Sequence, residues 1–285
     1  MRKLALLLAV AVVAAACDPN PEPEDACTVG ANGEDPVIIV AGTFSPGIAN
    51  EIFFGNGVEA AGVTHCVFEL KGHDDLGNLP GTMPIEVSAY ALGMFVDEVL
   101  AWSGATQVDL VGHSQGALVA RQYVKAYGGD TTVDTLVSLS GPNTGTDVVP
   151  LFDWLLSPLL SPFGVGCDDI WPCVQMQQES DFITTLNTGG MTPGDVDYYA
   201  FFTDNDELVW YWGEGPLGIP VIKHDNAELG PGATNVQVDD ECPLRVVGHL
   251  GMILDPVVLH MTIDALEGNP IDVPLLTCLL PPVPV

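Results

Sequence analysis

One serine of this chain is flanked two residues away by glycine on each side, in the pentad 112–116 (GHSQG). A short apolar run, 108–111, precedes the pentad, and a helix-like stretch, 117–127, follows it. A Gly-x-Ser-x-Gly pentad between a strand and a helix is typical of a nucleophile elbow, a tight turn that exposes the serine hydroxyl at the end of a sheet. We therefore expect Ser114 to be a nucleophile for acyl groups.

Such a serine needs a general base, and the base needs an acid to orient it, because a serine hydroxyl is a weak nucleophile at neutral pH. After this kind of elbow the acid comes next in the chain and the histidine last. A strand-like run, 197–203, leads into a turn that carries Asp206, which we expect to be the acid. A second strand-like run, 243–247, leads to His249 on a glycine-flanked loop, which we expect to be the base.

The neighbouring acids and the other histidines are weaker candidates. Asp204 and Glu207 lie within two residues of Asp206, and we expect them to form a solvated face of the loop. His113 lies inside the elbow and is expected to point away from the serine side chain. The remaining histidines lie upstream, in polar loops or in an expected C-terminal helix: His65, His73, His224 and His260.

Acyl chemistry also needs hydrogen-bond donors where negative charge develops on the carbonyl oxygen. The backbone N–H of Gln115, directly after the serine, is one candidate. The second is expected in the loop after the first core strand, where Thr43 offers its N–H and its hydroxyl. The alternative for Thr43 is a plain turn after a strand.

With these segments in place, the chain resembles the α/β-hydrolase lipases, nearest to the yeast lipase B type and then to the small bacterial lipases. The resemblance spans residues 27 to about 278. It departs at Ala41, where bacterial lipases usually carry histidine, and the yeast enzyme's elbow lacks the first glycine-histidine pair. Four segments carry it: 36–43 (PVIIVAGT), 114–116 (SQG), 205–209 (NDELV) and 235–251 (NVQVDDECPLRVVGHLG).

The resemblance implies a triad of Ser114, Asp206 and His249, with Thr43 and Gln115 as the oxyanion hole. It also implies two disulfides, one joining Cys27 to Cys66 and one joining Cys242 to Cys278. If both form, Cys167 and Cys173 remain and close a short loop. A zinc site at the cysteines is the rival interpretation, but no paired Cys-x-x-Cys is present.

The N-terminus predicts export. Residues 1–16 combine a basic start with an apolar run of signal-peptide length, too short to span a membrane permanently. The run ends in Ala-Ala-Ala-Cys, which resembles a bacterial lipobox and favours lipidation of Cys17 over ordinary cleavage. Setting Cys17 aside leaves six of the seven cysteines, enough for three disulfides in an exported protein.

The rest of the chain predicts one α/β domain. Residues 17–35 are acidic and proline-rich and are expected to be a tether, and 36–285 are expected to form the α/β-hydrolase domain. Strand-like runs alternate with helical stretches such as 85–103, which indicates a mostly parallel sheet covered on both faces. The apolar region at about 145–196 is expected to be an inserted cap, or else buried helix packing, and the tail from 269 a surface strap. The expected strands are 37–41, 65–70, 107–111, 134–140, 197–203 and 243–247.

The formal net charge of −31 excludes nucleic-acid binding, because a phosphate backbone requires a basic surface. It also disfavours anionic lipid, apart from a covalent anchor. No Asp-x-Asp-x-Asp-Gly calcium loop is present. We expect no metal and no organic cofactor, a monomer, and an extracellular or cell-envelope location.

These features predict an exported serine esterase or lipase that cleaves neutral acyl esters, small or lipid, through an acyl-serine intermediate. A polyester depolymerase or an acyltransferase with the same triad stays open, because the acceptor depends on pocket shape and water access. A peptidase is disfavoured, since no charged anchor for a peptide terminus is evident. The alternative from another class is a non-catalytic surface-binding protein on a hydrolase scaffold.

Overall fold

A seven-stranded sheet forms the centre of the molecule in the computed structural model, which describes residues 22–31, 35–147 and 166–281. The expected signal peptide, Cys17 and residues 148–165 of the expected cap lie outside the described residues. The strand order is β1-β3-β2-β4-β5-β6-β9. All neighbouring pairs are parallel except β1 with β3, so the predicted mostly parallel sheet is confirmed. The seven strands are β1 (Cys27–Thr28), β2 (Val37–Val40), β3 (His65–Phe68), β4 (Val108–His113), β5 (Val133–Leu139), β6 (Asp197–Phe202) and β9 (Ala233–Gln237).

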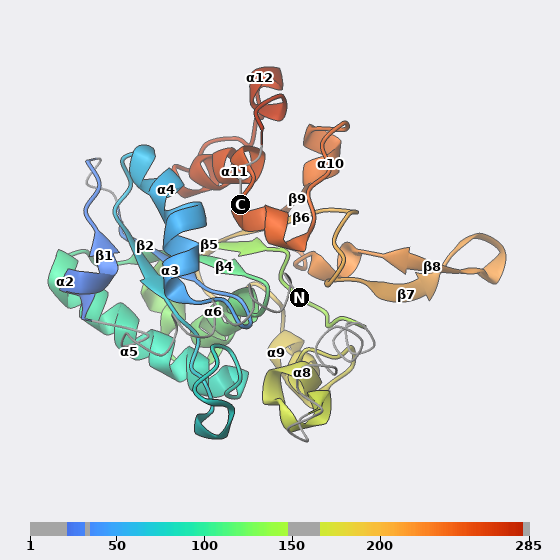
Figure 1. Cartoon of the computed structure of the whole chain (residues 1–285), viewed down its shortest axis with the longest axis horizontal. Coiled ribbons are helices and arrows are strands. Elements are labelled where there is room, and N and C mark those ends of the chain that lie inside the picture. The colour runs from blue at the N-terminus through green and yellow to red at the C-terminus, as the bar shows by residue number, and fades with distance from the viewer. Residues whose placement is uncertain (1–21, 32–34, 148–165, 282–285) are drawn as a thin grey trace, which may run out of the picture.

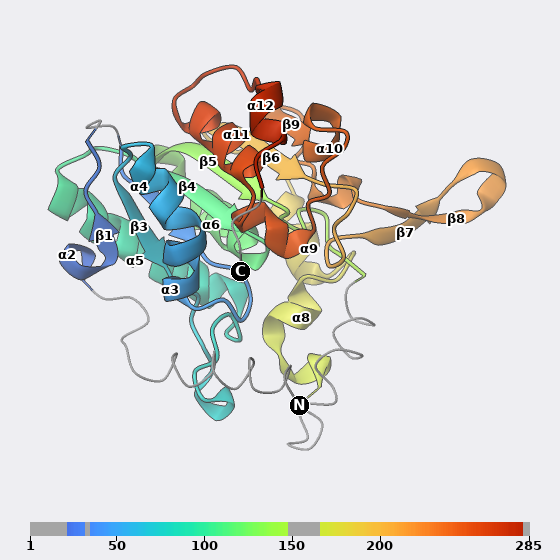
Figure 2. The same ribbon diagram turned by 45° about the horizontal axis from the view of Figure 1, so that its top comes forward.

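Helices cover both faces of the sheet, as the strand sequences require. In β2 the residues Ile38 and Val40 belong to one buried cluster and Val37 and Ile39 to the other, because side chains alternate across a strand. Figures 1 and 2 show α5 and α6 on one side and α4 and α11 on the other. The helices are α2 (Pro23–Ala26), α3 (Gly47–Asn50), α4 (Asn56–Ala60), α5 (Ile85–Ser103), α6 (Gln115–Ala126), α8 (Trp171–Gln175), α9 (Asp181–Asn187), α10 (Val238–Glu241), α11 (Pro256–Leu266) and α12 (Leu275–Cys278). Among these described helices, none has the length and apolar character needed to cross a membrane.

The last strand of the sheet is β9, and the expected strand at 243–247 is wrong. That segment is irregular, and Leu244 and Val246 are 100% and 77% exposed. Its apolar residues favoured a strand, but the Cys242 disulfide and an ion pair of Arg245 hold it as a loop. The true edge strand, ATNVQ, is mostly polar because an edge faces water, and it therefore lacked the apolar run expected of a strand.

The folded domain begins before residue 36, which corrects part of the expected tether. Within 22–31, the buried Pro23 starts helix α2, and β1 then pairs with β3 at the edge of the sheet. Cys27 lies opposite Cys66 in this pairing, and the two form a disulfide. The acidic, proline-rich composition suggested a solvated chain, but the disulfide draws its end onto the sheet.

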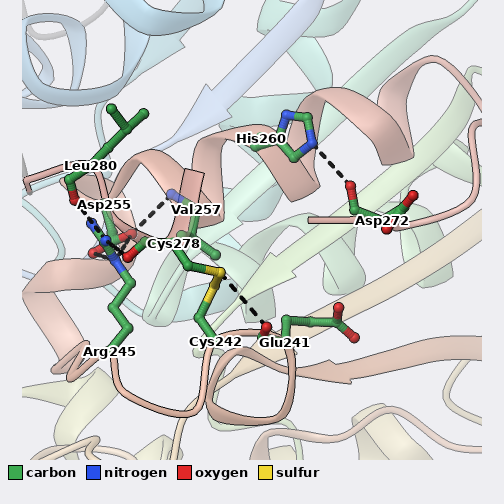
Figure 3. Close-up of a disulfide and its surroundings, with 9 residues drawn as sticks. All are labelled: Glu241, Cys242, Arg245, Asp255, Val257, His260, Asp272, Cys278 and Leu280. Atoms are coloured by element: carbon green, nitrogen blue, oxygen red, sulfur yellow. Dashed lines mark hydrogen bonds and ion pairs between the residues drawn. A yellow bond between two sulfur atoms is a disulfide. The ribbon is translucent and has the colours of Figure 1, made fainter. Parts of the chain in front are cut away.

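The C-terminal segment is tied back to the domain by a disulfide and by one arginine (Figure 3). Cys242 bonds Cys278, and Arg245 pairs with Asp255 at 2.7 Å while donating to the carbonyls of Cys278 and Leu280. The tail was expected to be a strap without a helix, yet it contains the four-residue α12. The remaining pair, Cys167–Cys173, also forms, so all three expected disulfides are confirmed.

A second, two-stranded sheet was not predicted. Strands β7 (Tyr211–Glu214) and β8 (Pro220–Lys223) form an antiparallel hairpin directly after the expected acid. Figure 2 shows this hairpin extending away from the rest of the molecule. Trp212 lies on this hairpin and is 58% exposed.

Candidate active site

The pentad 112–116 folds as the predicted strand-turn-helix. Strand β4 ends at His113 and helix α6 begins at Gln115, so Ser114 occupies the turn alone, with φ 56° and ψ −124°. This backbone conformation is unfavourable for a residue with a side chain, and it persists because the surroundings fix it. The N–H of Ser114 donates to the carbonyl of Leu139 on β5 at 2.9 Å.

The two glycines of the pentad explain how the turn can be so tight. A Cβ at Gly112 would lie 2.6 Å from the Cα of Ala117, and one at Gly116 would lie 2.2 Å from the carbonyl oxygen of Val40. Helix α6 therefore packs directly on β2 and on its own preceding strand. Any side chain at either position would separate the helix from the sheet and displace Ser114.

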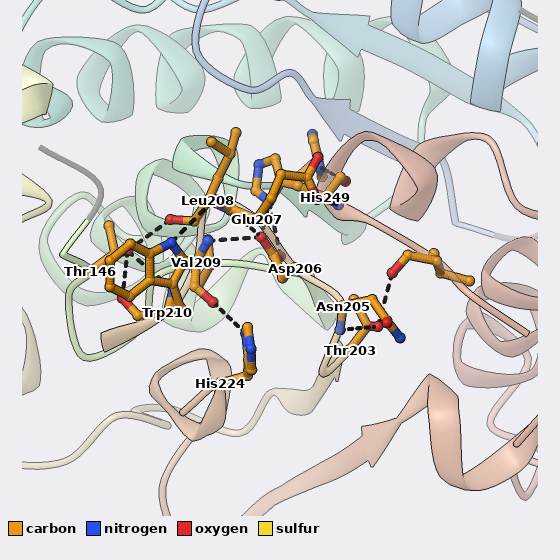
Figure 4. Close-up of polar contacts among 12 residues, drawn as sticks. Thr146, Thr203, Asn205, Asp206, Glu207, Leu208, Val209, Trp210, His224 and His249 are labelled. Carbon is orange, nitrogen blue, oxygen red and sulfur yellow. Dashed lines mark hydrogen bonds and ion pairs between the residues drawn. The ribbon is translucent and has the colours of Figure 1, made fainter. Parts of the chain in front are cut away.

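Asp206 and His249 form a buried hydrogen-bonded pair at the carboxyl ends of the strands (Figure 4). The Nδ1 atom of His249 lies 3.1 Å from Oδ1 and 3.0 Å from Oδ2 of Asp206. The two residues are 4% and 2% exposed. The structure therefore brings together the acid and the base that the sequence predicted.

The surroundings of Asp206 favour its charged form. Burial alone would raise the pKa of Asp206, yet its pKa is lowered, because the His249 imidazole and two backbone N–H groups favour the carboxylate. These N–H groups belong to Leu208 and Val209, at 2.8 and 2.7 Å from Oδ1. An anion fixed in this way holds the proton of the imidazole on Nδ1 and leaves Nε2 free to accept another.

Two further residues of the acid loop hold the segment around His249. The hydroxyl of Thr203 donates to the carbonyl of Val247 at 2.9 Å, and the N–H of His249 donates to Oε2 of Glu207 at 2.9 Å. Glu207 is exposed, as expected of a solvated face, and its contact with the N–H of His249 is a further role that was not predicted. Sequence reasoning missed both residues because hydrogen bonds to a distant main chain leave no local pattern.

His113 packs against the imidazole of His249. Its Nε2 lies 3.0 Å from the carbonyl oxygen of His249, and the two ring centres are 4.7 Å apart. Burial and the neighbouring His249 lower the pKa of His113 to about 3, so its ring is neutral at ordinary pH. His113 therefore contacts the expected base but does not itself accept the proton of Ser114.

The expected oxyanion donors lie side by side. The hydroxyl of Thr43 donates to Oε1 of Gln115 at 2.6 Å. A Cβ at Gly81 would lie 2.9 Å from that same oxygen and 3.0 Å from the Cα of Thr43, so a third segment closes against both residues. Within the described ranges, the backbone N–H groups of Thr43 and Gln115 donate no hydrogen bond, which leaves them available to an anion.

In the part of the chain that the structure describes, no group of three or more His, Cys, Asp or Glu side chains is placed to hold an ion. The arrangement instead offers a strained serine, a carboxylate-histidine pair and two free N–H groups. These are the parts of acyl transfer by a serine nucleophile.

Residues 90–229 match the family model described as lipase (class 2), a range that includes Ser114 and Asp206. Lipase B of Aspergillus fumigatus is similar in structure, with a TM-score of 0.63 and 21% identity over 86% of this chain and 57% of that chain. The mature lipase BlEst2 of Bacillus licheniformis gives 0.52 and 15%, over 78% of this chain and 87% of that one. The esterase RhEst1 of Rhodococcus sp. ECU1013 gives 0.50 and 14%, over 86% and 94%. No curated protein matches the chain by sequence.

Because their sequence identities are low, the structural likenesses establish the fold alone. This chain also spans only 57% of the length of the Aspergillus lipase. The match to the class 2 lipases adds a likeness in sequence over residues 90–229, a range that begins within α5 and ends just after the hairpin. The chain therefore has the α/β-hydrolase fold of these lipases and esterases, and its residues 90–229 are similar to the class 2 lipases.

Proposed function

We propose that this protein hydrolyses neutral carboxylic esters through an acyl-enzyme formed on Ser114. The observation that carries the proposal is the buried Asp206–His249 pair at the same sheet edge as a serine held at φ 56°. The match to the class 2 lipases supports it independently.

In the first half of the reaction, the Oγ of Ser114 attacks the ester carbonyl while Nε2 of His249 takes the hydroxyl proton. Asp206 stabilises the imidazolium that results. The N–H groups of Thr43 and Gln115 donate to the tetrahedral oxyanion. The intermediate collapses, the C–O bond to the alcohol breaks, and His249 returns its proton to the leaving alkoxide.

In the second half, water replaces the alcohol. His249 takes a proton from the water as it attacks the acyl carbonyl, and returns this proton to Oγ of Ser114 as the acid leaves. An alcohol in place of water would give acyl transfer with the same residues. Polyester cleavage would differ only in the substrate that reaches the serine.

We also propose that the protein is exported as a monomer and anchored through Cys17. Three disulfides in one domain support export, because they persist in oxidising compartments. The strongly acidic chain leaves a covalent lipid as the favoured link to a membrane.

The test is hydrolysis of p-nitrophenyl esters from acetate to palmitate by the chain lacking 1–16, beside its Ser114→Ala variant. We expect the substitution to lower kcat by roughly 10⁴-fold or more. Ser103→Ala, at the end of α5, is the matched control and should leave activity unchanged. Covalent labelling by a fluorophosphonate should occur on Ser114 alone.

Each other outcome has a definite meaning. A folded wild-type chain with no activity on any ester and no labelling would overturn the proposal in favour of a binding protein. Equal activity in Ser114→Ala would remove the serine from the mechanism. Faster acyl transfer to an added alcohol than to water would identify an acyltransferase.

A further inference from the structure

The main chain of His249 is held on both sides by side chains from other segments. Its N–H donates to Oε2 of Glu207 at 2.9 Å, and its carbonyl accepts from Nε2 of His113 at 3.0 Å. Glu207 directly follows the expected acid, and His113 directly precedes the expected nucleophile. Each of the other two catalytic segments therefore reaches the backbone of the base.

We propose that His113 and Glu207 are positioning residues that fix the main chain of His249, so that its imidazole stays aligned between Asp206 and Ser114. The inference rests on the proposed function for its catalytic meaning, while the two hydrogen bonds are open to test without any substrate. These hydrogen bonds keep the imidazole in one precise position, and a displacement of about 1 Å in a catalytic group can cost about 10²-fold in rate.

The hydrogen bond between His113 and the carbonyl of His249 fixes the tautomer of His113. A carbonyl oxygen only accepts, so Nε2 of His113 carries the proton, and its Nδ1 is the deprotonated nitrogen. That Nδ1 is buried and has no hydrogen-bond partner within the described residues. A proton on Nδ1 would place a buried charge with no acceptor, so His113 remains a neutral donor to His249.

This neutrality also matters for the reaction. The rings of His113 and His249 are 4.7 Å apart, and His249 becomes an imidazolium whenever it holds the proton of Ser114. Two cations at that distance would repel each other in a buried site. A histidine that cannot protonate is therefore a suitable neighbour, where a lysine or arginine would oppose the proton transfer.

The glycine that precedes His249 leaves room for the Glu207 carboxylate at the N–H of His249. A Cβ at Gly248 would lie 2.7 Å from Oε2 of Glu207 and would push the carboxylate away. The negative charge shortens and strengthens the hydrogen bond to the N–H. The Gly-His sequence of the base loop thus has a structural reason beyond loop flexibility.

Paired substitutions separate the hydrogen bonds from packing. His113→Met and Glu207→Met remove the donor and the acceptor at similar size, whereas His113→Gln and Glu207→Gln keep a donor and an acceptor within reach. We expect each methionine variant to lower kcat by about 10- to 100-fold with little change in KM, in proportion to the misalignment. We expect the glutamine variants to recover most of the loss. Asp204→Asn, an exposed acid of the same loop, is the control.

NMR of the histidine side chains gives a readout that needs no activity. In the wild type, His113 should show a proton on Nε2 and none on Nδ1, and His249 should show a hydrogen-bonded Nδ1 proton at low field. In the methionine variants that low-field proton should exchange faster with water. Thermal unfolding shows whether each variant is folded.

The outcomes keep this inference apart from the proposed function. A wild type that is inactive on esters but shows the Nε2 proton on His113 would refute the function and leave the positioning contacts standing. A proton on Nδ1 of His113 would overturn the inference, whatever the activity. So would folded methionine variants with full kcat, or glutamine variants as impaired as the methionine ones.

Discussion

Replacement of Asp109 by asparagine should stabilise this protein, and more so as the pH rises. Asp109 lies in β4, is 6% exposed and accepts hydrogen bonds from Thr135, one of them from its N–H at 2.9 Å. Burial above all, and then the nearby carboxylates of Asp134 and Asp35, raise the pKa of Asp109 from its ordinary value of 3.8 to about 8. The folded state therefore keeps a proton on this carboxyl that the unfolded chain releases.

The direction of the effect follows from proton binding. Between about pH 4 and pH 8 the native state binds more protons at Asp109 than the unfolded state, so the free energy of unfolding falls as the pH rises. Each pH unit inside this window costs up to about 1.4 kcal/mol. Asparagine accepts from Thr135 in the same way and does not titrate. The advantage of Asp109→Asn should therefore grow by about 2 to 3 kcal/mol between pH 5 and pH 7.

Urea denaturation followed by tryptophan fluorescence at pH 5, 6 and 7 measures this difference directly, with the disulfides intact. Asp134→Asn, an exposed neighbour on β5, is the matched control and should change the pH dependence only slightly. If the wild type and Asp109→Asn kept a constant difference across these pH values, the carboxyl would not be protonated in the native state and the reasoning would be refuted.

Three further variants test the packing, the site and a disulfide. Gly116→Ala should destabilise the fold by about 3 kcal/mol or more, because its Cβ would lie 2.2 Å from a carbonyl of β2; a urea curve like that of the wild type would contradict this close packing. Thr43→Val should lower kcat on p-nitrophenyl esters by tenfold at most, since the hydroxyl is committed to Gln115; a loss of about 10²-fold would instead make the hydroxyl an oxyanion donor. The double variant Cys27→Ser, Cys66→Ser should lose about 4 kcal/mol in guanidinium unfolding, because that disulfide spans a sequence separation of 39; unchanged stability would exclude this contribution.

The sheet was largely predictable from the sequence because its strands are buried on both faces. Continuous apolar runs such as that of β2 have few alternative structures, and the glycines of the elbow mark where a chain must turn tightly. Edge elements carry no such pattern. The polar β9 was missed for this reason. The apolar segment 243–247 was mistaken for a strand because its course is decided by a disulfide to Cys278 and by the ion pair of Arg245 with Asp255, which its own pattern does not reveal.

The candidate site likewise has residues that the local sequence pattern predicted and residues that only the folded structure reveals. Chain order and glycine context are local properties, and they were enough to bring Asp206 and His249 forward as a pair that the structure joins. Glu207 and His113 act on the main chain of a residue distant in sequence, so their contacts appear only once the chain is folded. The hairpin of β7 and β8 was missed because its residues lack a simple apolar alternation.

The contacts of His249 also bear on how the chain acquires its native state. His249 meets Asp206 across 43 residues of sequence and His113 across 136. Loops of that length close late, because they lose the most chain entropy before any contact is gained. The strands can pair and the helices can pack while the base is still far from its partners. Recovery of a functional His249 should therefore be among the last events of refolding, later than the return of secondary structure.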